Sequence, residues 1–425
     1  MRKKIVIIGG GFGGLSAAKE FNDFDADITL IDKTNYHLFQ PLLYQVATAA
    51  LSPADIAAPI RAVLNKQKNT TVVMDEVTAI DRVNKKVITK GSEYSFDYLI
   101  IAIGSSHSYF GKDEWEKNAP GLKTLNDALN IREKILLSLE SAEKMNNPEE
   151  TIKYLTFVIV GGGPTGVEMA GAIAEIVKIS MMKDFRNINS EMTKVYLIEA
   201  LPRLLTAYPE DLYEIAKKDL ETLGVEVLLN TMVVDVNDEG VALKDKFIPT
   251  KNIIWAAGNT VSPLLKSLNT ELDKAGGVIV NPDLSLKDDS NIFVIGDAAH
   301  LKDKKGNMLP GIAPVAMQEG RYAAGIVKEG KDADLRESFK YIDKGTMATI
   351  GRAKAICYIG GLKFTGFFAW LIWCVIHIFF LISFRNRFKV MAEWAWYYIT
   401  FRHGIRLITG HPEKQEEIRN SNTPD

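Results

Sequence analysis

Cysteine is scarce in this chain of 425 residues, which contains two, Cys357 and Cys374. Two cysteines cannot form a disulfide framework, and the sequence has no C-x-x-C redox pair and no zinc-ligand spacing. Because residues 1–356 contain no cysteine, chemistry that needs redox-active cysteines in that part is disfavoured. The two that are present are most simply explained as small hydrophobic residues.

A strong excess of charge of one sign is also absent. The net charge of −2 gives no reason to expect nucleic acid as a partner, and 47% apolar with 24% charged residues indicates a folded chain. The length predicts two or three domains. The charge is unevenly spread, because the part from Tyr341 onward has 11 Lys and Arg against 6 Asp and Glu, and it holds four of the six tryptophans. A basic, Trp-rich end on an acidic body predicts contact with an anionic membrane surface.

Room for a cleaved leader is lacking, since the first predicted strand begins at Lys4. We therefore expect the body of the protein to be cytoplasmic, or to reach its compartment by other means. A long uncharged run of 21 residues lies between Lys363 and Arg385, and its length would permit one transmembrane helix. Against a spanning helix, the run contains His377 and is followed by a basic cluster (Arg385, Arg387, Lys389) and by apolar residues at helical spacing (Phe388, Met391, Ala395, Tyr398). Two consecutive aromatic, basic helices favour a position in the membrane interface.

The chain is organised around its opening stretch. A buried apolar strand, Ile5–Ile8, runs directly into Gly9-x-Gly11-x-x-Gly14 and then into a helical pattern. This order is typical of a dinucleotide-binding turn, in which glycines let the backbone approach a pyrophosphate at the positive end of a helix. A second strand follows and ends at Asp32, the position expected for a carboxylate that holds a ribose hydroxyl.

The same pattern returns in the middle of the chain. A strand from Tyr154 leads into Gly161-x-Gly163-x-x-Gly166 and a helical run, and a further strand ends at Glu199. The separation between the glycines and Glu199 is longer than usual, and residues 179–192 look like an insertion in the crossover. An acidic residue there favours NADH over NADPH, although Arg203 nearby leaves NADPH open.

Between and after these motifs the sequence predicts further elements. The segment Asn35–Thr48 has no helix or strand periodicity, and we interpret it as an aromatic loop that either lines a ring system or is an ordinary connection. Strands are predicted near 72–77, 86–89, 98–104, 225–229, 252–258 and 291–296, with helices over 121–150 and 315–329 and a linker at 146–148. The predicted fold class is α/β, with two interleaved Rossmann-like dinucleotide-binding domains and a C-terminal amphipathic helical membrane anchor.

With these motifs placed, the chain resembles the two-dinucleotide-domain flavoproteins, and within them the type II NADH:quinone oxidoreductases, which are single-subunit, non-pumping respiratory dehydrogenases. The most specific pieces are Tyr36–Thr48, Gly161–Glu168 and the aromatic tail from Trp370 to Trp396. The resemblance implies FAD on the first fingerprint and NADH on the second. It further implies hydride transfer from NADH to flavin N5, two electrons passed to a membrane quinone, and a monotopic tail that does not span the membrane. No membrane-embedded ion path is apparent, so we expect no proton pumping.

On this basis residues 1–115 and 282–335 are predicted as the FAD-binding domain, 116–281 as the NADH-binding domain, and 336–425 as the membrane-anchoring region. The residues predicted to contact FAD are Gly9, Gly11, Phe12, Gly13, Gly14, Asp32, Lys33, Thr48, Val77, Ala102, Gly104, Asp297, Ala313, Pro314 and Val315. Those predicted to contact NADH are Gly161, Gly163, Pro164, Thr165, Gly166, Glu199 and Gly258. No metal is expected.

Glu168 and Gln318 are the candidate catalytic residues. The resemblance places Glu168 near the nicotinamide and flavin, where it would assist proton or electron transfer; the alternative is a carboxylate that stabilises the first turn of its helix. Gln318 would border the flavin and quinone, or else be an ordinary helix-surface amide. Asp297 would bind the flavin's ribityl or pyrophosphate region, a geometry compatible with a helix-capping acid. Where the family often has Ala-Gln-x-Ala-x-Gln, this chain has Pro314 in place of the first glutamine, which puts the quinone hydrogen-bonding scheme in doubt.

Two alternatives stay open from the sequence. A sulfide:quinone oxidoreductase shares the fold but needs redox cysteines beside the flavin, and a flavin- and NADH-binding redox sensor would turn over slowly. The expected partners are a membrane quinone, ubiquinone or menaquinone, and an anionic phospholipid surface on the cytoplasmic face of the inner membrane. A homodimer is left open, and nucleic acid is not expected. His37 and His377 are interpreted as packing or hydrogen-bonding residues.

Overall fold

The computed structural model describes residues 2–180, 182–400 and 405–408. The chain forms two compact units, each built from separated segments. The first contains residues up to 38, 57–108 and 259–344, and the second contains 39–56, 109–258 and the residues from 345 onward. The units therefore divide the chain at other residues than the predicted domains, most clearly at 259–281, which pack with the first unit. The cofactors assigned to those domains stay predictions.

The first unit contains these helices and strands in chain order: β1 (Lys3–Ile8), α1 (Phe12–Glu20), β2 (Ala26–Asp32), β3 (Tyr36–Leu38), β4 (Ala57–Pro59), α4 (Ile60–Val63), β5 (Thr70–Met74), β6 (Val77–Asp81), β7 (Lys86–Thr89), β8 (Glu93–Ser95), β9 (Tyr98–Ile101), β10 (Ser106–His107), β18 (Asn259–Thr260), η6 (Pro263–Leu268), β19 (Val278–Ile279), β20 (Ser285–Leu286), β21 (Asp289–Val294), η7 (Gly296–Ala298), β22 (Ala299–His300), α9 (Ala313–Glu329) and η8 (Ala333–Leu335).

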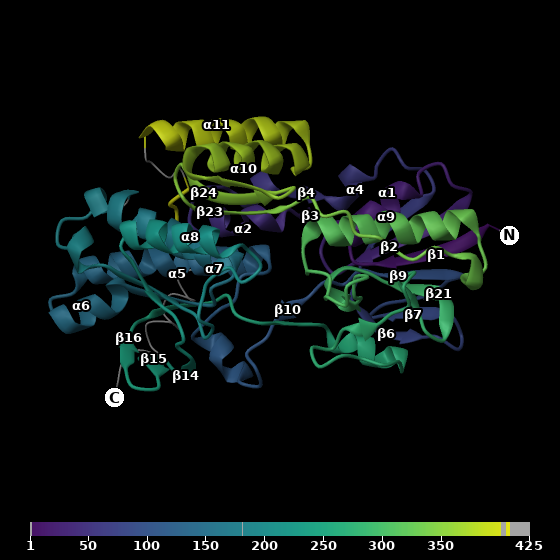
Figure 1. Cartoon of the computed structure of the whole chain (residues 1–425), viewed down its shortest axis with the longest axis horizontal. Coiled ribbons are helices and arrows are strands. Elements are labelled where there is room, and N and C mark those ends of the chain that lie inside the picture. Colours follow the sequence, from purple (N-terminus) through teal and green to yellow (C-terminus); the bar gives the residue numbers. More distant parts are fainter. Residues whose placement is uncertain (1, 181, 401–404, 409–425) are drawn as a thin grey trace. The chain divides into compact units, whose positions relative to one another are not determined.

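Its main sheet has six strands in the order β20-β21-β9-β1-β2-β5, and all neighbours are parallel except β20 and β21. Residues 5–8 of β1 are all buried, as expected for a strand with both faces covered. Helices α1 and α9 lie side by side over this sheet (Figure 1). Their contact is close, because a Cβ on Gly320 would lie 2.3 Å from the Gly13 carbonyl oxygen.

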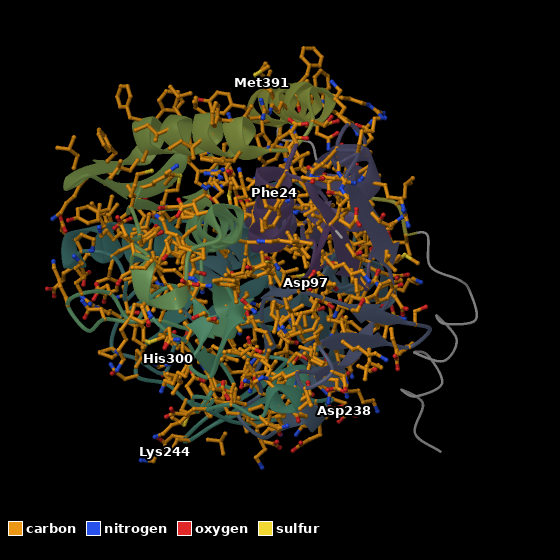
Figure 2. All side chains as sticks on the ribbon, turned by 90° about the vertical axis from the view of Figure 1, so that its right-hand side faces the viewer. Phe24, Asp97, Asp238, Lys244, His300 and Met391 are labelled. Carbon is orange, nitrogen blue, oxygen red and sulfur yellow. The ribbon has the colours of Figure 1, made fainter. Side chains whose placement is uncertain are left out.

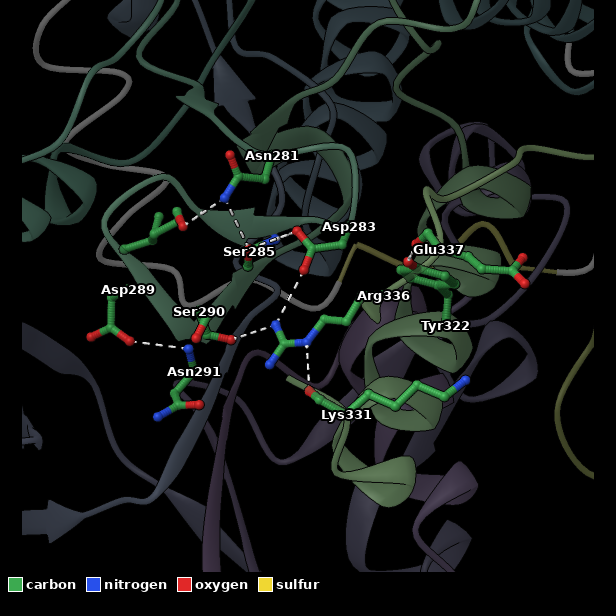
Figure 3. A network of polar contacts seen from close by, with 11 residues as sticks. Asn281, Asp283, Ser285, Asp289, Ser290, Asn291, Tyr322, Lys331, Arg336 and Glu337 are labelled. Atoms are coloured by element: carbon green, nitrogen blue, oxygen red, sulfur yellow. Dashed lines mark hydrogen bonds and ion pairs between the residues drawn. The ribbon is translucent and has the colours of Figure 1, made fainter. Parts of the chain in front are cut away.

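The segment after α9 is fastened to the β20–β21 hairpin by the buried side chain of Arg336 (Figure 3). Its Nη1 donates to the Asp283 carboxylate at 3.1 Å and to the Ser290 carbonyl at 2.7 Å, while Nε donates to the Lys331 carbonyl at 3.1 Å. Ser285 also donates to Asp283, through both its backbone N–H and its hydroxyl. A buried ion pair needs such additional hydrogen bonds to offset the loss of hydration.

The second unit contains, in chain order, η1 (Gln40–Leu42), α2 (Leu43–Ala47), α3 (Pro53–Ile56), η2 (Asp113–Lys117), α5 (Leu125–Lys144), α6 (Pro148–Leu155), β11 (Thr156–Val160), α7 (Pro164–Glu175), η3 (Ile176–Ser180), η4 (Met182–Asp184), η5 (Ser190–Met192), β12 (Lys194–Ile198), α8 (Glu210–Thr222), β13 (Val225–Leu228), β14 (Val233–Val236), β15 (Gly240–Leu243), β16 (Phe247–Pro249), β17 (Asn252–Trp255), β23 (Thr346–Gly351), β24 (Lys354–Ile359), β25 (Leu362–Thr365), α10 (Gly366–Phe380) and α11 (Phe384–Thr400).

Its central sheet is parallel, with the order β13-β12-β11-β17, and a three-stranded antiparallel sheet β14-β15-β16 accompanies it. The C-terminal part adds a second antiparallel sheet, β23-β24-β25. Helix α7 packs closely on β23, since a Cβ on Gly171 would lie 1.7 Å from the Ile350 carbonyl oxygen. This contact fixes the helix of the second fingerprint against the C-terminal sheet.

The predicted pair of tail helices is present as α10 and α11, which lie next to each other over β23 and β24 (Figure 1). Ala369 of α10 packs on Ala355 and Cys357 of β24, and the Cys357 thiol donates to the Ala369 carbonyl. Among the described residues, none of the helices combines the length and the apolar character that crossing a bilayer requires.

Three local predictions are wrong. The segment 35–48 contains the strand β3 and the helices η1 and α2. These short elements depend on contacts in the folded core, so the sequence shows no repeating pattern for them. The stretch 72–77 divides into the end of β5 and the start of β6. Pro148 is the first residue of α6, capped by the Asn147 side chain, rather than part of a linker.

Candidate functional site

The first glycine fingerprint forms an open cradle at the start of α1. Gly9 has a φ of +99°, and a Cβ on Gly14 would lie 1.9 Å from the Gly9 carbonyl oxygen, so both positions require glycine. At Gly11, the N-cap residue, a Cβ would meet no atom of the described residues within 4 Å. The N-cap position of α1 therefore borders open space, and the positive end of a helix suits a phosphate group.

Asp32 organises the backbone beside this cradle. Its carboxylate accepts hydrogen bonds from the Gly10 N–H at 2.6 Å and from the N–H and hydroxyl of Thr34 at 2.6 and 2.7 Å. A carboxylate has about four lone-pair positions, so these three bonds leave room for one more donor such as a ribose hydroxyl. The ribose role predicted for Asp32 fits this geometry and stays a prediction.

The other residues predicted to contact FAD are distributed unevenly. Asp297 lies in η7 and accepts a hydrogen bond from the Ser105 hydroxyl at 2.5 Å. Ser105 follows Gly104, whose φ is +65°. Ala102 follows β9, Lys33 is exposed after β2, and Val77 begins β6, which lies in a separate three-stranded sheet. Phe12 makes an edge contact with His37, and Gly13 is buried in packing contacts with Ile295 and Ala316. Thr48 belongs to the second unit, and its contact with FAD stays a prediction.

Pro314 has a structural explanation. It occupies the first turn of α9, after the N-cap Ile312, with Ala313 before it and the buried Val315 after it. The first turn of a helix has no internal acceptor for its N–H groups, so a proline is tolerated there. The loss of the glutamine side chain at this position therefore does not disturb the helix.

Gln318 is used by the chain itself. Its Nε2 donates to the Ile342 carbonyl at 3.0 Å, and its Oε1 accepts from the Ile342 N–H at 3.0 Å. The amide thus pairs with one peptide group and holds the segment that follows α9. Contact with flavin or quinone stays a prediction for Gln318, and the observed pairing favours a structural role.

Glu319 was not among the predicted site residues, and its side chain is buried, with 2% exposed. It accepts a hydrogen bond from the Gly296 N–H at 2.6 Å, and burial raises the pKa of its carboxyl to about 8, with the Asp297 charge acting in the same direction. A carboxylate at a helix position between Gln318 and Gly320 gives no periodic signal that would have singled it out.

The second fingerprint repeats the first. Gly161 has a φ of +111°, a Cβ on Gly166 would lie 1.8 Å from the Gly161 carbonyl oxygen, and a Cβ on Gly163 would meet no described atom within 4 Å. Pro164 and Thr165 are exposed at the start of α7, and Gly258, with a φ of +74°, follows β17. Glu199 accepts hydrogen bonds from the Gly162 N–H at 2.5 Å and the Leu201 N–H at 2.8 Å, which parallels Asp32 despite the longer crossover.

Glu168 lies in the second turn of α7, so the alternative of a first-turn carboxylate is wrong. It lines a cavity of about 70 Å³ whose walls come from α2, α7, the end of β23, α10 and α11. Burial raises the pKa of its carboxyl to about 8, opposed by a long hydrogen bond of 3.4 Å from the Thr349 N–H. Thr48, predicted to contact FAD, lines this cavity as well.

Aromatic and hydroxyl side chains that the sequence did not single out complete the cavity. The Tyr44 hydroxyl shares a hydrogen bond of 2.9 Å with the Thr349 hydroxyl and accepts another from the Gln45 amide at 3.0 Å. Gln45 in turn accepts a hydrogen bond from the Trp394 indole at 2.7 Å. Tyr44 and Gln45 are within the motif Tyr36–Thr48, but Thr349 and Trp394 lie about 180 residues or more from Glu168 in sequence, so only the fold brings them together.

The outer side of the tail helices is apolar. Large hydrophobic side chains that are each more than a third exposed follow α10 and α11: Phe367, Phe368, Leu371, Val375, Phe379, Phe388, Met391, Trp396 and Ile399. Figure 2 shows Met391 directed away from its helix. Lys389, one of the basic residues that follow the apolar run, pairs with the buried Asp55 at 2.6 Å.

His37 and His377 are hydrogen-bonded packing residues, as predicted. His37 is buried with Nδ1 3.0 Å from the Gly10 carbonyl oxygen, and His377 stacks on Trp373 with Nδ1 2.7 Å from the Trp373 carbonyl oxygen. Burial lowers the pKa of the His377 imidazole to about 4. Among the described residues, no group of three His, Cys, Asp or Glu side chains is arranged to hold a metal ion.

The structure and the sequence both match known proteins. The chain superposes with the structure of NDH2 from Plasmodium falciparum in complex with NADH at a TM-score of 0.87, with 22% identity over 94% of this chain and 99% of that one. It also superposes with the sulfide:quinone oxidoreductase of Aquifex aeolicus at 0.73, with 19% identity over 99% and 95% of the two chains. At these identities, both likenesses establish the fold alone.

Sequence comparison is more specific. Residues 3–320 match the family model of pyridine nucleotide-disulphide oxidoreductases, and residues 344–403 match that of the NDH2 C-terminal domain. The chain is 43% identical to the type II NADH:quinone oxidoreductase Ndh of Mycobacterium tuberculosis, over 96% of this chain and 90% of that protein. These matches confirm the resemblance found in the sequence: the chain belongs to the pyridine nucleotide-disulphide oxidoreductase family and, within it, to the type II NADH:quinone oxidoreductases.

Proposed function

We propose that the protein is an FAD-dependent NADH:quinone oxidoreductase of the respiratory chain, with FAD in the first cradle and NADH in the second. The observation that carries the proposal is the repetition of one cradle in both units. Each has an open glycine N-cap, Gly11 or Gly163, and a strand-end carboxylate, Asp32 or Glu199, bonded to the glycine loop. A chain that moves electrons from a nicotinamide to a flavin needs two such sites.

The first cradle fits the pyrophosphate of FAD, because a Cβ on the N-cap Gly11 would meet no described atom within 4 Å and the positive end of α1 lies there. Bound FAD would supply the redox chemistry, taking a hydride from NADH and releasing two electrons to the quinone. The chain's residues orient the nucleotides, exclude water and hold protons. In the second cradle, Glu199 would accept a hydrogen bond from a ribose hydroxyl and disfavour the 2′-phosphate of NADPH.

We assign the quinone ring to the cavity beside Glu168. Its volume of about 70 Å³ has room for about two water molecules, and Trp370, Trp373 and Trp394 supply apolar walls. With a pKa of about 8, Glu168 holds a proton at neutral pH. It can donate that proton to a quinone oxygen as negative charge develops there, which is general acid catalysis.

We further propose that α10 and α11 lie on the cytoplasmic surface of the inner membrane, with their apolar sides in the bilayer interface. Burying one phenylalanine side chain contributes about 1.5–3 kcal/mol, whereas a basic residue near an anionic leaflet contributes about 1 kcal/mol. The exposed aromatic residues therefore dominate binding, and Lys389 adds little because Asp55 neutralises it.

Anaerobic rapid mixing tests the redox proposal. NADH should bleach the flavin absorbance of the purified holoprotein, and ubiquinone-1 should then restore it. Bleaching by sulfide instead of NADH would support a sulfide:quinone oxidoreductase. A reduced flavin that persists in the presence of ubiquinone-1 would support a sensor, and a protein that binds no flavin would refute the assignment.

Vesicle sedimentation tests the membrane proposal. The double variant Phe368→Ser/Phe379→Ser should bind vesicles that contain phosphatidylglycerol at least about tenfold more weakly, because two exposed rings are lost. The matched control is Phe247→Ser, which changes an exposed phenylalanine on β16. Equal loss of binding in the control, or none in the double variant, would contradict the proposal.

A further inference from the structure

A second buried carboxyl, that of Glu175, lines the same cavity as Glu168. The two residues are seven positions apart on α7, so they lie on the same face of the helix, about 10.5 Å apart along its axis. Ala172, between them, contributes only a methyl group to the wall. Both acids can therefore reach the cavity from one helix.

The position of Glu175 is closely specified. Its Oε1 accepts a hydrogen bond from the Arg352 N–H at 2.5 Å, and its Oε2 accepts one from the Tyr397 hydroxyl at 3.0 Å. A Cβ on Gly351 would lie 2.8 Å from Oε1, so a side chain at that position would displace the carboxyl. Segments from α7, β23 and α11 thus agree on one place for this group.

Groups that can pass protons line the cavity that the two acids share. The cavity is lined by the hydroxyl-bearing residues Tyr44, Thr349 and Tyr397, and it has room for about two water molecules. Tyr44 and Thr349 share a hydrogen bond of 2.9 Å, and the Thr349 N–H contacts Glu168. Glu175 accepts a hydrogen bond from the hydroxyl of Tyr397, which lines the same cavity.

The charges that face Glu175 come from two elements. Arg352 and Lys354, at the β23–β24 turn, favour its ionised form, although Lys354 also pairs with Asp219 of α8 at 2.9 Å. Burial opposes them and is the larger effect, so the pKa of the Glu175 carboxyl is raised above its usual range. The neighbouring hydroxyl of Tyr397 has its pKa raised as well and stays protonated.

The proposed reaction sets the demand for protons. NADH, one proton and a quinone give NAD⁺ and a quinol, so a hydride supplies two electrons with one hydrogen, and one further proton must come from solvent in each turnover. Two quinone oxygens each form a new O–H bond. Glu168 alone stores one proton, and it must be reloaded before the next turnover.

We propose that Glu175 supplies this second proton: its O–H bond breaks, the proton passes through cavity water and hydroxyl groups to reload the Glu168 side of the cavity, and solvent then reprotonates Glu175. This inference rests on the proposed quinone reductase function. Glu175 acts through other groups and not by touching the quinone. It is a proton-transfer residue that α7, Gly351 and Tyr397 hold in place.

The test compares Glu175→Gln, Glu175→Asp and the surface control Glu221→Gln of α8 in the holoprotein. Flavin reduction by NADH and reoxidation by ubiquinone-1 are followed separately, in H₂O and D₂O, across pH. We expect E175Q to slow reoxidation about tenfold and to increase its solvent isotope effect, while reduction by NADH stays unchanged. E175D, which can still titrate, should recover most of the rate, and E221Q should behave as wild type.

A second readout does not depend on turnover. Infrared difference spectra between acidic and alkaline pH should contain a protonated-carboxyl band that E175Q removes and E221Q keeps. Tyr397→Phe covers the case in which E175Q loses its flavin, since Y397F keeps the carboxyl and should show the same slower reoxidation and larger isotope effect.

Wild-type reoxidation rates and isotope effects in both E175Q and Y397F would overturn the inference, and so would equal slowing of the reaction with NADH. A wild-type protein that NADH reduces but ubiquinone-1 does not reoxidise would overturn the proposed function, and this inference with it. Slowing of reoxidation confined to E175Q and Y397F supports both.

Discussion

The carboxylates of the two cradles and the carboxyl of Glu168 serve in opposite settings. Asp32 accepts three hydrogen bonds, and Glu199 accepts two, from the loops that they organise. Among the described contacts of Glu168, one long hydrogen bond of 3.4 Å stands against burial, and its pKa rises to about 8. Short-range backbone donors turn an acid into part of a loop, whereas an apolar cavity keeps its proton available for transfer.

The cradles and the cavity should respond differently to substitution. A cradle depends on backbone that approaches backbone, so adding atoms should damage it most. The cavity depends on one exchangeable proton, so an isosteric change that removes the proton should be enough.

The largest effect is expected for Gly166→Val. Its Cβ would meet the Gly161 carbonyl oxygen at 1.8 Å, and neither backbone segment can move without opening the second cradle. Flavin reduction by NADH should fall at least about 1,000-fold, while the flavin content is kept because the first cradle lies in the other unit. The matched control is Gly325→Ala in α9, where a Cβ would meet no described atom within 4 Å. Normal reduction of G166V by NADH would refute the assignment of NADH to this cradle.

The next effect is expected for Glu168→Gln. The amide has the same shape but no transferable acid proton, so reoxidation by quinone should slow about 100-fold. Because the acid form is needed and the pKa is about 8, the wild-type rate should be high below pH 8 and fall as the pH rises above it. E168Q should lose this fall. Unchanged turnover and an unchanged pH profile in E168Q would remove Glu168 from the mechanism.

The difference between these sites also explains what the sequence could and could not predict. The cradles are contiguous in sequence, so Gly9, Gly14 and Asp32 could be placed from spacing alone, and the parallel sheets follow from the apolar strands beside them. The cavity joins Tyr44, Glu168, Thr349 and Trp394, whose proximity depends on tertiary packing. Glu168 was identified through its motif, but Glu175 and Glu319 were missed because a buried acid on a helix has no local signature. Short elements such as α2 were missed because they have no repeating pattern in the sequence.

Glu319 shows whether burial alone makes an acid catalytic. Its folded pKa of about 8 exceeds that of an unfolded glutamate, so the folded state binds more protons between about pH 4.5 and 8 and loses stability as the pH rises through that range. Glu319→Gln keeps an acceptor for the Gly296 N–H and should raise the free energy of unfolding at pH 8 by about 2–4 kcal/mol, with little change at pH 4.5. Denaturant unfolding of the FAD-saturated protein measures this. Destabilisation of the variant at pH 8 would contradict the raised pKa of Glu319, whereas slowing of reoxidation like that in E168Q would mean that Glu319 has a function beyond packing.

The smallest effect is expected for substitutions that test whether the two cradles bind different nucleotides. Glu199→Gln keeps an oxygen for the Gly162 N–H but removes the charge that disfavours a 2′-phosphate, so the preference of kcat/KM for NADH over NADPH should fall about three- to tenfold. The equivalent change in the first cradle, Asp32→Asn, should leave that preference unchanged and weaken the retention of flavin during dilution, because Asp32 also holds Gly10 and Thr34. If both changes altered the NADH preference equally, the assignment of one nucleotide to each cradle would fail. If E199Q alone altered the NADH preference, the two cradles would bind different nucleotides although their geometry is the same. The difference would then come from the surroundings of each carboxylate, which the spacing of residues in the sequence does not reveal.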